Sequence, residues 1–390
     1  MLQTTRKTLL ALVAGSAFAF AFGAPAAKAQ DLVIGGSIPL TGVFAFAGIG
    51  IEAGMQDYIA YVNEQGGVHG RQLRLAYEDT GYQVDQSVAV FNRLTSQHDI
   101  HLYYGDSTAF SRTINPELNR MNSMIMAGAS FASEINDPEA FPFQFMAGPD
   151  YTEMTNILLE YIAQETPGAR VLLVNSDTEF GRDPIEGTRA RAEELGLTIA
   201  DVIITPPGAV DVSTEILKLR RARPDYAIFH GYILAPLPEF MSQARELGLD
   251  TKFMGTFWSM DNSIWQSVGE VADGFMGVMP YRYYFDEEEA PMLEHIRSVR
   301  PEYQSTAYIQ GYLTAMLLVE AAKRTLDEGQ ELTAENLKAA LNSIEDFDTG
   351  GLIGVPISIP GNSIPVGRVY QYDAEAERMV AVSDWINVQE

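Results

Sequence analysis

The chain contains no cysteine among its 390 residues, which excludes disulfide bonds, zinc–thiolate sites and thiol-based catalysis. Basic residues are also scarce, since 26 Lys and Arg stand against 52 Asp and Glu and give a formal net charge of −26. A chain this acidic matches neither nucleic acid nor an anionic membrane surface, so we expect neither as a partner. Hydrophobic residues make up 46% of the chain, which is the composition of a globular protein.

Sequence signatures of common enzyme classes are missing as well. We find no nucleophile elbow, no Walker loop and no His-Glu-x-x-His motif, and the five histidines are scattered without metal-ligand spacing. The nearest approach to a dinucleotide fingerprint is Gly48-Ile-Gly50-Ile-Glu-Ala-Gly54, whose last spacing is one residue too long and which lies within an expected helix. We therefore predict no catalytic residues, no cofactor and no metal site. A dinucleotide-dependent oxidoreductase is the alternative that we rank last.

The first 29 residues have the features of an export signal. A basic pair at Arg6-Lys7 precedes an apolar run over 9–22 and the small-residue site Ala27-Lys28-Ala29. The apolar run is short for a membrane span, which needs about 20 residues. We predict a secretory signal peptide over 1–29 and a mature chain that starts near Gln30. Its removal takes away three basic residues and no acidic one, which leaves a net charge of −29.

A strand–loop–helix unit opens the expected mature chain. The apolar run Leu32–Ile38 suits a buried strand, and a helix with apolar residues three and four apart then runs to Gly66-Gly67. Similar patterns alternate along the chain, including an expected strand at Phe143–Ala147 and a charged first helical turn at Asp286–Glu289. Such alternation predicts an α/β fold with largely parallel sheets covered on both faces. Ligands of these folds bind at the carboxyl ends of the strands.

Three breaks in the pattern predict that the chain passes between two lobes more than once. They lie at Ala147-Gly148-Pro149, at Gly277–Pro280 and at Asp348-Thr-Gly-Gly351. We therefore predict one lobe from 30–148 plus 281–348, and a second from 149–280 plus 349–390.

An ordered series of short motifs resembles the Leu/Ile/Val-binding group of periplasmic substrate-binding proteins of ABC transporters. The matching pieces are Ile34-Gly35 through Thr41-Gly42, Asn63 to Leu73, Tyr77 to Thr80, Tyr104-Gly105, Met126 to Ser130, Phe180-Gly181, Tyr226 to Tyr232, and Phe253 to Gly255. The resemblance covers nearly all of the expected mature chain. It implies the type I fold, with two Rossmann-like lobes joined by three strands and a ligand cleft that closes on binding. It also implies a periplasmic monomer that binds a small molecule and docks on an ABC permease in the inner membrane.

The same resemblance implies which residues contact the ligand. In that family, hydroxyls and backbone N–H groups on two loops of the first lobe hold a ligand carboxylate. Here those loops carry Ser107 and Thr108, and Gly128 to Ser130. The family's serine on the first loop falls on Ser107, Thr108 or Ala109. Ordinary helix capping is the competing interpretation of these hydroxyls, and it is compatible with ligand binding.

Aromatic residues crowd the expected cleft. We predict ligand contacts from Phe46, Phe180, Tyr232, Phe257 and Tyr281. Such an apolar slot with few polar anchors fits a flat or hydrophobic acid.

One position departs from the family pattern and bears on the ligand. Amino-acid-binding members tend to carry an acid two residues after the glycine matched by Gly255, whereas this chain has Phe257 there. An ammonium buried without its partner loses on the order of 2–5 kcal/mol of binding energy. We therefore predict a small carboxylic acid, aromatic or apolar, without an α-amino group, with Arg282 either pairing its carboxylate or forming a surface ion pair.

Three alternatives stay open. A branched-chain or other amino acid is the ligand if Asp106, Asp177 or Glu179 replaces the missing acid. An aromatic box also suits a quaternary ammonium through cation–π contact. Finally, the chain is a ligand sensor if its closed form docks on a membrane receptor instead of a permease.

Overall fold

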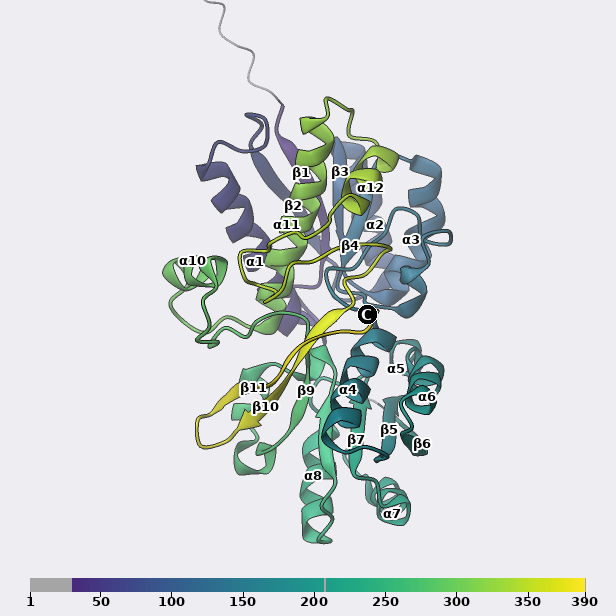
Figure 1. Cartoon of the computed structure of the whole chain (residues 1–390). Helices are drawn as coiled ribbons and strands as arrows, with labels where there is room; N and C mark the ends of the chain where they lie inside the picture. The colour runs from purple at the N-terminus through teal and green to yellow at the C-terminus, as the bar shows by residue number, and fades with distance from the viewer. Residues whose placement is uncertain (1–29, 207, 390) are drawn as a thin grey trace, which may run out of the picture.

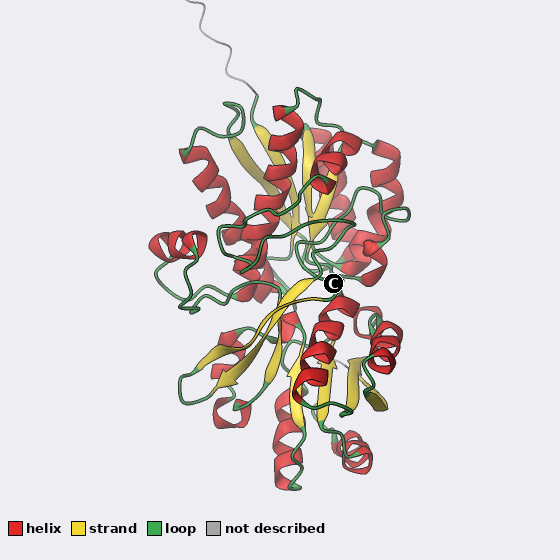
Figure 2. Cartoon of the chain, viewed as in Figure 1, coloured by secondary structure: helices red, strands yellow, loops and turns green. Residues whose placement is uncertain are grey.

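Residues 30–206 and 208–389 are described by the computed structural model. The expected signal peptide over 1–29 lies outside these residues. In the described part of the chain, no helix is long and apolar enough to cross a membrane. The chain forms two α/β lobes, one above the other in Figure 1, each with helices on both sides of its sheet (Figure 2). The predicted α/β fold class with two parallel-rich lobes is confirmed.

The first lobe is built on a four-stranded, fully parallel sheet in the order β2-β1-β3-β4. Its strands are β1 (Leu32–Ile38), β2 (Leu73–Asp79), β3 (Ile100–Gly105) and β4 (Ile125–Gly128). The helices of this lobe are α1 (Ala45–Glu64), α2 (Val84–Gln97), α3 (Thr108–Met121), the 3-10 helix η1 (Ser133–Asn136), α10 (Pro291–Val299), α11 (Thr306–Asp327) and α12 (Ala334–Asn342). Every residue of β1 is buried, because helices cover both faces of this central strand.

Helices α1 and α11 cross so closely that only glycine fits at the contact. A Cβ atom on Gly54 would lie 2.1 Å from the carbonyl oxygen of Tyr308, and one on Gly311 would lie 2.3 Å from that of Ile51. The missing side chains let the two backbones touch. This contact ties a helix from the start of the chain to one from its last third.

The second lobe is built on a seven-stranded sheet in the order β11-β10-β9-β8-β7-β5-β6. Five strands are parallel, and the last two form an antiparallel hairpin that pairs with β9. The strands are β5 (Arg170–Ser176), β6 (Thr198–Thr205), β7 (Tyr226–His230), β8 (Lys252–Gly255), β9 (Met276–Met279), β10 (Val366–Asp373) and β11 (Arg378–Asn387). The helices are α4 (Tyr151–Glu165), α5 (Glu179–Arg182), α6 (Ile185–Glu194), α7 (Ser213–Ala222), α8 (Leu237–Glu246), η2 (Phe257–Ser259), α9 (Asn262–Gln266) and η3 (Gly269–Ala272).

The third passage between the lobes lies later in the chain than the boundary predicted at 348–349. Asp348 instead closes a turn on the first lobe, where its carboxylate accepts the backbone N–H groups of Gly350 and Gly351 at 2.8 and 3.3 Å. The chain stays on this lobe as far as Asn362, whose side-chain amide donates to the carbonyl oxygen of Ile135 at 2.6 Å. It joins the second lobe as β10 begins at Val366.

Aromatic side chains hold the two lobes against each other. The ring of Phe44 in the first lobe meets Trp258 of the second edge-on, with centroids 4.8 Å apart. Phe131 of the first lobe similarly meets Phe257 of the second at 5.8 Å. The structure therefore has the lobes closed onto each other.

Candidate ligand-binding cleft

A cavity of about 740 Å³ lies between the two lobes, which is within the usual size range of small-molecule sites. The first lobe lines it with Val43, Phe44, Tyr82, Val84, Asp106, Ser107, Thr108, Ala109 and Ala129. The second lobe lines it with Tyr151, Thr178, Glu179, Phe180, Gly208, Gly231, Tyr232, Ile233, Leu234, Ala235 and Trp258. Apolar and aromatic side chains dominate this lining, and none of these residues is Lys, Arg or His.

The cavity owes its position to the parallel sheets. In the first lobe its walls follow the carboxyl ends of β1, β2, β3 and β4, and in the second those of β5, β6, β7 and β8. Parallel strands bring their carboxyl ends to one edge of a sheet, so loops far apart in the sequence meet there. Facing edges from two lobes then enclose the cavity.

The polar end of the cavity is the start of α3. Ser107 caps this helix by accepting the N–H of Phe110 at 3.2 Å, and its hydroxyl donates to the carboxylate of Asp106 at 3.0 Å. The single hydroxyl proton of Ser107 is therefore not available to a ligand. The hydroxyls of Thr108 and Ser130 lie 2.8 Å apart, so one proton joins them and the other is free. Together with the first N–H groups of the helix, the Thr108–Ser130 pair offers donors to an anion.

Asp106 is a buried carboxylate in the cavity wall. The hydroxyls of Thr80 and Ser87 donate to its Oδ2 atom, and Ser107 donates to Oδ1. Burial raises the pKa of Asp106, and the three hydroxyl donors oppose that rise. None of these three partners carries a positive charge.

An aromatic wall faces this polar end. The ring of Phe44 stacks on Tyr82 with centroids 4.8 Å apart, while its edge meets Trp258. Burial, together with the charge of Asp106, raises the pKa of Tyr82 to about 12, so its hydroxyl stays protonated. Tyr82 therefore offers a neutral hydroxyl beside apolar rings.

A buried histidine supports the opposite wall. The Nε2 atom of His230 lies 3.0 Å from the carbonyl oxygen of Phe180, which can only accept, so Nε2 carries the proton. Nδ1 then accepts the hydroxyl of Thr256 at 2.9 Å. Burial lowers the pKa of His230 to about 3, which keeps the ring neutral. His230 thus holds the backbone that carries the Phe180 ring.

Four of the ten side chains predicted to contact the ligand line the cavity, namely Ser107, Thr108, Phe180 and Tyr232. Ser130 lies behind the wall, bonded to Thr108 and 3% exposed. Gly128 lies in β4, where a Cβ atom would approach the carbonyl oxygen of Gly105 to 2.0 Å, so its role there is to let two strands come together.

The other four predicted residues, Phe46, Phe257, Tyr281 and Arg282, lie away from the cavity lining. Phe46 is 41% exposed, and its ring meets that of Phe44 edge-on with centroids 5.2 Å apart. Phe257 is fully buried between Trp258 and Tyr281, whose ring centroids lie 4.8 and 5.4 Å away, and Tyr281 is equally buried.

Arg282 is buried, and it belongs to an ion-pair cluster whose acid, Glu288, is about half exposed. It donates to the carbonyl oxygen of Gly351 at 2.8 Å and pairs with Glu288, which also pairs with Arg368 at 2.7 Å. The expected helical turn at Asp286–Glu289 is wrong, because this segment is a loop before α10. Its acid Glu288 is used to neutralise two arginines.

The ten predicted contacts leave out Tyr82, Tyr151 and Trp258, which line the cavity. Tyr82 directly follows the Thr80-Gly81 turn after β2. The rule that ligands bind at the carboxyl ends of parallel strands would therefore have identified it. Trp258 adjoins Phe257, and the one-residue difference follows from the turn of η2, which buries Phe257. Tyr151 starts α4 after a passage between lobes, and no sequence motif marks it.

Two of the acids named above as replacements for the family carboxylate also have partners. Asp177 forms an ion pair with Arg182 at 2.7 Å and does not line the cavity. Glu179 does line it, but it is paired with Arg112 of the first lobe.

Comparison with known proteins gives a consistent match over the described chain. The family described as periplasmic binding protein matches residues 31–377. The Leu/Ile/Val-binding protein of Escherichia coli (strain K12) is 25% identical over 328 residues, which cover 82% of this chain and 85% of the relative.

Two solved structures share the fold. A branched-chain amino acid ABC transporter protein from Thermus thermophilus with bound valine has a TM-score of 0.79 at 24% identity, covering 92% of this chain and 97% of that one. A solute-binding protein of an ABC transporter from Rhodopseudomonas palustris BisB5, in complex with 3,4-dihydroxybenzoic acid, has a TM-score of 0.73 at 19% identity, with coverages of 92% and 97%. At these identities the likeness establishes the fold.

Proposed function

This chain belongs to the periplasmic binding protein family, and on that premise we propose that it captures a carboxylic acid in the periplasm for an ABC importer. The ligand has an apolar or aromatic body and no α-amino group. The chain works as a monomer, without catalysis and without a cofactor, and it passes its ligand to a permease in the inner membrane.

The lining of the cavity carries this proposal. Its walls are aromatic and aliphatic, and its unused donors are concentrated at the Thr108–Ser130 hydroxyl pair and the first N–H groups of α3. An anion at this helix start is stabilised by those donors and by the helix dipole. The apolar body of the acid then fills the space between Phe44, Tyr82 and Phe180. The relative crystallised with 3,4-dihydroxybenzoic acid shows that this fold accommodates an aromatic acid.

The acids of the wall already have partners of their own. The carboxylate of Asp106 already accepts three hydroxyls, and that of Glu179 is bound to Arg112. Phe257 occupies the place of the family acid and is buried behind Trp258. An α-ammonium would therefore lose its water without gaining a dedicated partner.

Capture proceeds by closure of the lobes. The acid binds the open form at α3, and the second lobe then brings Phe180, Tyr232 and Trp258 over its apolar body. Because the ligand touches both lobes only in the closed form, its binding shifts the population toward that form.

A second candidate ligand is an amino acid. Asp106 favours it, because this carboxylate lies in the wall and its three partners are neutral. The relative from E. coli is named for Leu, Ile and Val.

A thermal-shift screen separates the two candidates. The panel pairs 3-phenylpropanoate with phenylalanine and 4-methylpentanoate with leucine, so that each pair differs in the α-amino group, and adds benzoate and glycine betaine. A ligand at 100 times its Kd stabilises the protein by about 2.7 kcal/mol, which gives a clear rise in melting temperature. A rise with the amine-free acids alone supports the proposal. A rise with leucine or phenylalanine instead overturns the ligand class, and a rise with betaine alone assigns the aromatic wall to a cation.

A further inference from the structure

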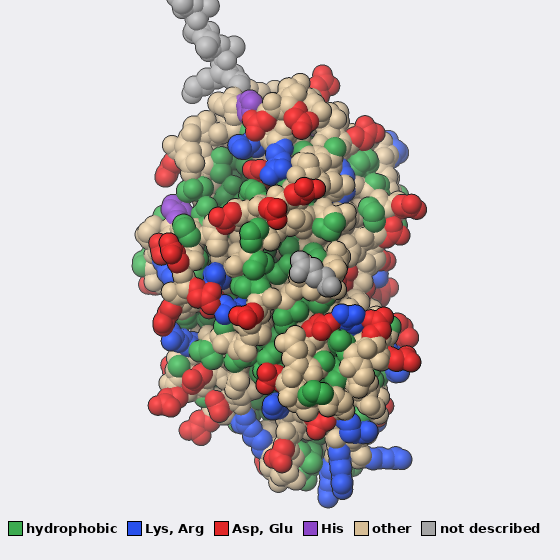
Figure 3. Space-filling view, viewed as in Figure 1, with side chains coloured by type: hydrophobic (Ala, Val, Ile, Leu, Met, Phe, Trp, Pro, Cys, Tyr) green, Lys and Arg blue, Asp and Glu red, His purple; other side chains and the backbone are tan. Residues whose placement is uncertain are grey.

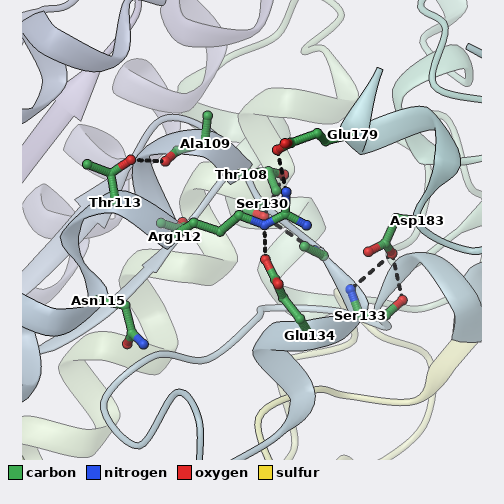
Figure 4. Close-up of polar contacts among 12 residues, drawn as sticks. Thr108, Ala109, Arg112, Thr113, Asn115, Ser130, Ser133, Glu134, Glu179 and Asp183 are labelled. Carbon is green, nitrogen blue, oxygen red and sulfur yellow. Dashed lines mark hydrogen bonds and ion pairs between the residues drawn. The ribbon is translucent and has the colours of Figure 1, made fainter. Parts of the chain in front are cut away.

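Polar side chains join the two lobes along α5, outside the aromatic contacts. Arg112 of α3 binds two carboxylates, those of Glu134 in its own lobe and Glu179 in the second lobe (Figure 4). At the other end of α5, Asp183 accepts the backbone N–H of Ser133 at 3.0 Å, and the hydroxyl of Ser133 donates to it at 2.7 Å. The first lobe thus holds both ends of this short helix.

The two contacts differ in their exposure to water. The side chain of Arg112 is 31% exposed and that of Glu179 is 75% exposed, so this ion pair lies at the edge of the cleft. Asp183 is more deeply placed, and burial raises its pKa against the effect of the two bonds from Ser133. The strength of the exposed Arg112–Glu179 ion pair therefore depends on charge and salt concentration. The strength of the more buried hydrogen bonds between Asp183 and Ser133 depends on geometry instead.

We propose that these five residues, Arg112, Ser133, Glu134, Glu179 and Asp183, form an interlobe latch that stabilises the closed form in the absence of ligand. The bonds from Arg112 to Glu179 and from Ser133 to Asp183 join the two lobes, and they break when the second lobe swings away. The inference rests on the proposed closure of the lobes, and it does not depend on the chemistry of the ligand.

The latch also completes the cavity wall. Glu179 and Phe180 on α5 line the cavity, so docking of this helix brings an aromatic ring over the ligand. Arg112 at the same time neutralises the Glu179 carboxylate, which would otherwise repel an incoming acid. Arg112 is thus a positioning residue, held in place by Glu134 and acting through Glu179.

The size of the effect follows from the exposure of the pair. Partly exposed ion pairs change an equilibrium by about two- to fivefold, and they weaken as salt screens them. We expect the ratio of closed to open molecules to fall about two- to fivefold when Arg112 or Glu179 loses its charge.

The absence of cysteine makes the test direct, because two introduced cysteines can be spin-labelled specifically. We choose Ile49→Cys in the first lobe and Val210→Cys in the second, which are 57% and 87% exposed. Both lie a few residues from cavity-lining positions, so the distance between their labels reports the opening of the cleft. Pulsed electron spin resonance on the ligand-free full mature chain then gives the populations of closed and open molecules.

The variants are Arg112→Ala, Glu179→Gln and, as a matched control, Arg120→Ala. Arg120 lies on the same helix but pairs with Glu117 within the first lobe. The latch predicts a closed population in the parent protein that decreases in Arg112→Ala and Glu179→Gln, decreases in 1 M NaCl, and is unchanged in Arg120→Ala. Equal distance distributions in the parent and both latch variants overturn the latch.

The same labels separate this failure from failure of the proposed function. If the best acid of the panel shortens the distance while the latch variants match the parent, closure stands and the latch is wrong. If Arg112→Ala has a larger open population than the parent, and that acid raises its melting temperature without restoring the closed distance, lobe closure on the ligand is wrong and the latch falls with it.

Discussion

Thr108 and Ser107 are adjacent hydroxyl residues with different functions. The proton of Ser107 is committed to Asp106 and its oxygen caps α3, whereas Thr108 and Ser130 share one proton and keep one free. Sequence reasoning could identify this pair from the helix start but could not choose between its members. The choice depends on Asp106 turning toward Ser107, which is a tertiary feature.

Replacement of Thr108 tests the proposed anchor. Thr108→Val removes the hydroxyl at nearly constant volume, and we expect the affinity for the best acid of the panel to fall about tenfold, as for a hydrogen bond to a charged group. Isothermal calorimetry measures the change. Thr113→Val is the matched control, because the Thr113 hydroxyl only bonds the Ala109 carbonyl within the same helix. Equal affinities in both variants would remove Thr108 from the site.

His230 predicts a pH dependence of stability. Its pKa is about 3 in the folded chain and about 6.5 when unfolded, so the unfolded state binds more protons between these values. Its contribution is complete above pH 6.5 and is lost as the pH falls, by about 2 kcal/mol at pH 5. Buried Asp150, whose pKa is raised to about 7 by burial and by Glu153, acts in the opposite direction.

The measurement therefore compares two proteins. Urea unfolding at pH 7 and pH 5 should show that the parent loses more stability than His230→Gln, which can still donate to Phe180 but does not titrate. Parallel pH dependences would mean that His230 is not the group responsible.

At the scale of elements, the local pattern of apolar residues predicts a strand or helix correctly wherever that element is buried along its length. The strand predicted at Leu32–Ile38 and the helix that follows it are confirmed, because the apolar pattern of each matches its covered faces. The strand predicted at Phe143–Ala147 is wrong. This apolar segment runs past the edge of the first sheet and makes a single bridge, between Gln144 and Met126. Its apolar residues are buried by the passage between lobes, which periodicity does not reveal.

The close crossing of α1 and α11 predicts a change in stability whose sign is opposite to the one that helix propensity predicts. Helix propensity alone would make Gly54→Ala stabilising by about 1 kcal/mol. The Cβ atom would lie 2.1 Å from the Tyr308 carbonyl oxygen, so we expect destabilisation by about 1–3 kcal/mol instead. Thermal and urea unfolding measure the change, and Gly311→Ala should behave alike. A gain in stability would show that the helices can move apart freely.

At the scale of the whole molecule, the excess of acidic residues does not form one continuous patch on the face seen in Figure 3. Acidic side chains are scattered over the face seen in Figure 3, while Lys and Arg gather at the lower tip beside α7 and α8. The sequence predicted two lobes, parallel sheets and a cleft, since these follow from alternation and from the family motifs. It could not predict which aromatic rings face the cleft, because that depends on how the lobes meet.

The fluorescence of Trp258 can report the contact between the two lobes. It contacts Phe44 and Phe131 across the lobe boundary, with ring centroids 4.8 and 6.3 Å away, so separation of the lobes exposes it to water. We expect the best acid of the panel to produce a saturable change in tryptophan fluorescence that Trp258→Phe largely removes. Trp265 lies within the second lobe and should contribute a constant background, whereas Trp385 packs against Gly354 of the first lobe and can respond to lobe separation as well. Trp265→Phe is the control and should keep the full change, with binding in each variant checked by thermal shift. A change that survives in Trp258→Phe would place the ligand-dependent movement elsewhere than at this aromatic boundary.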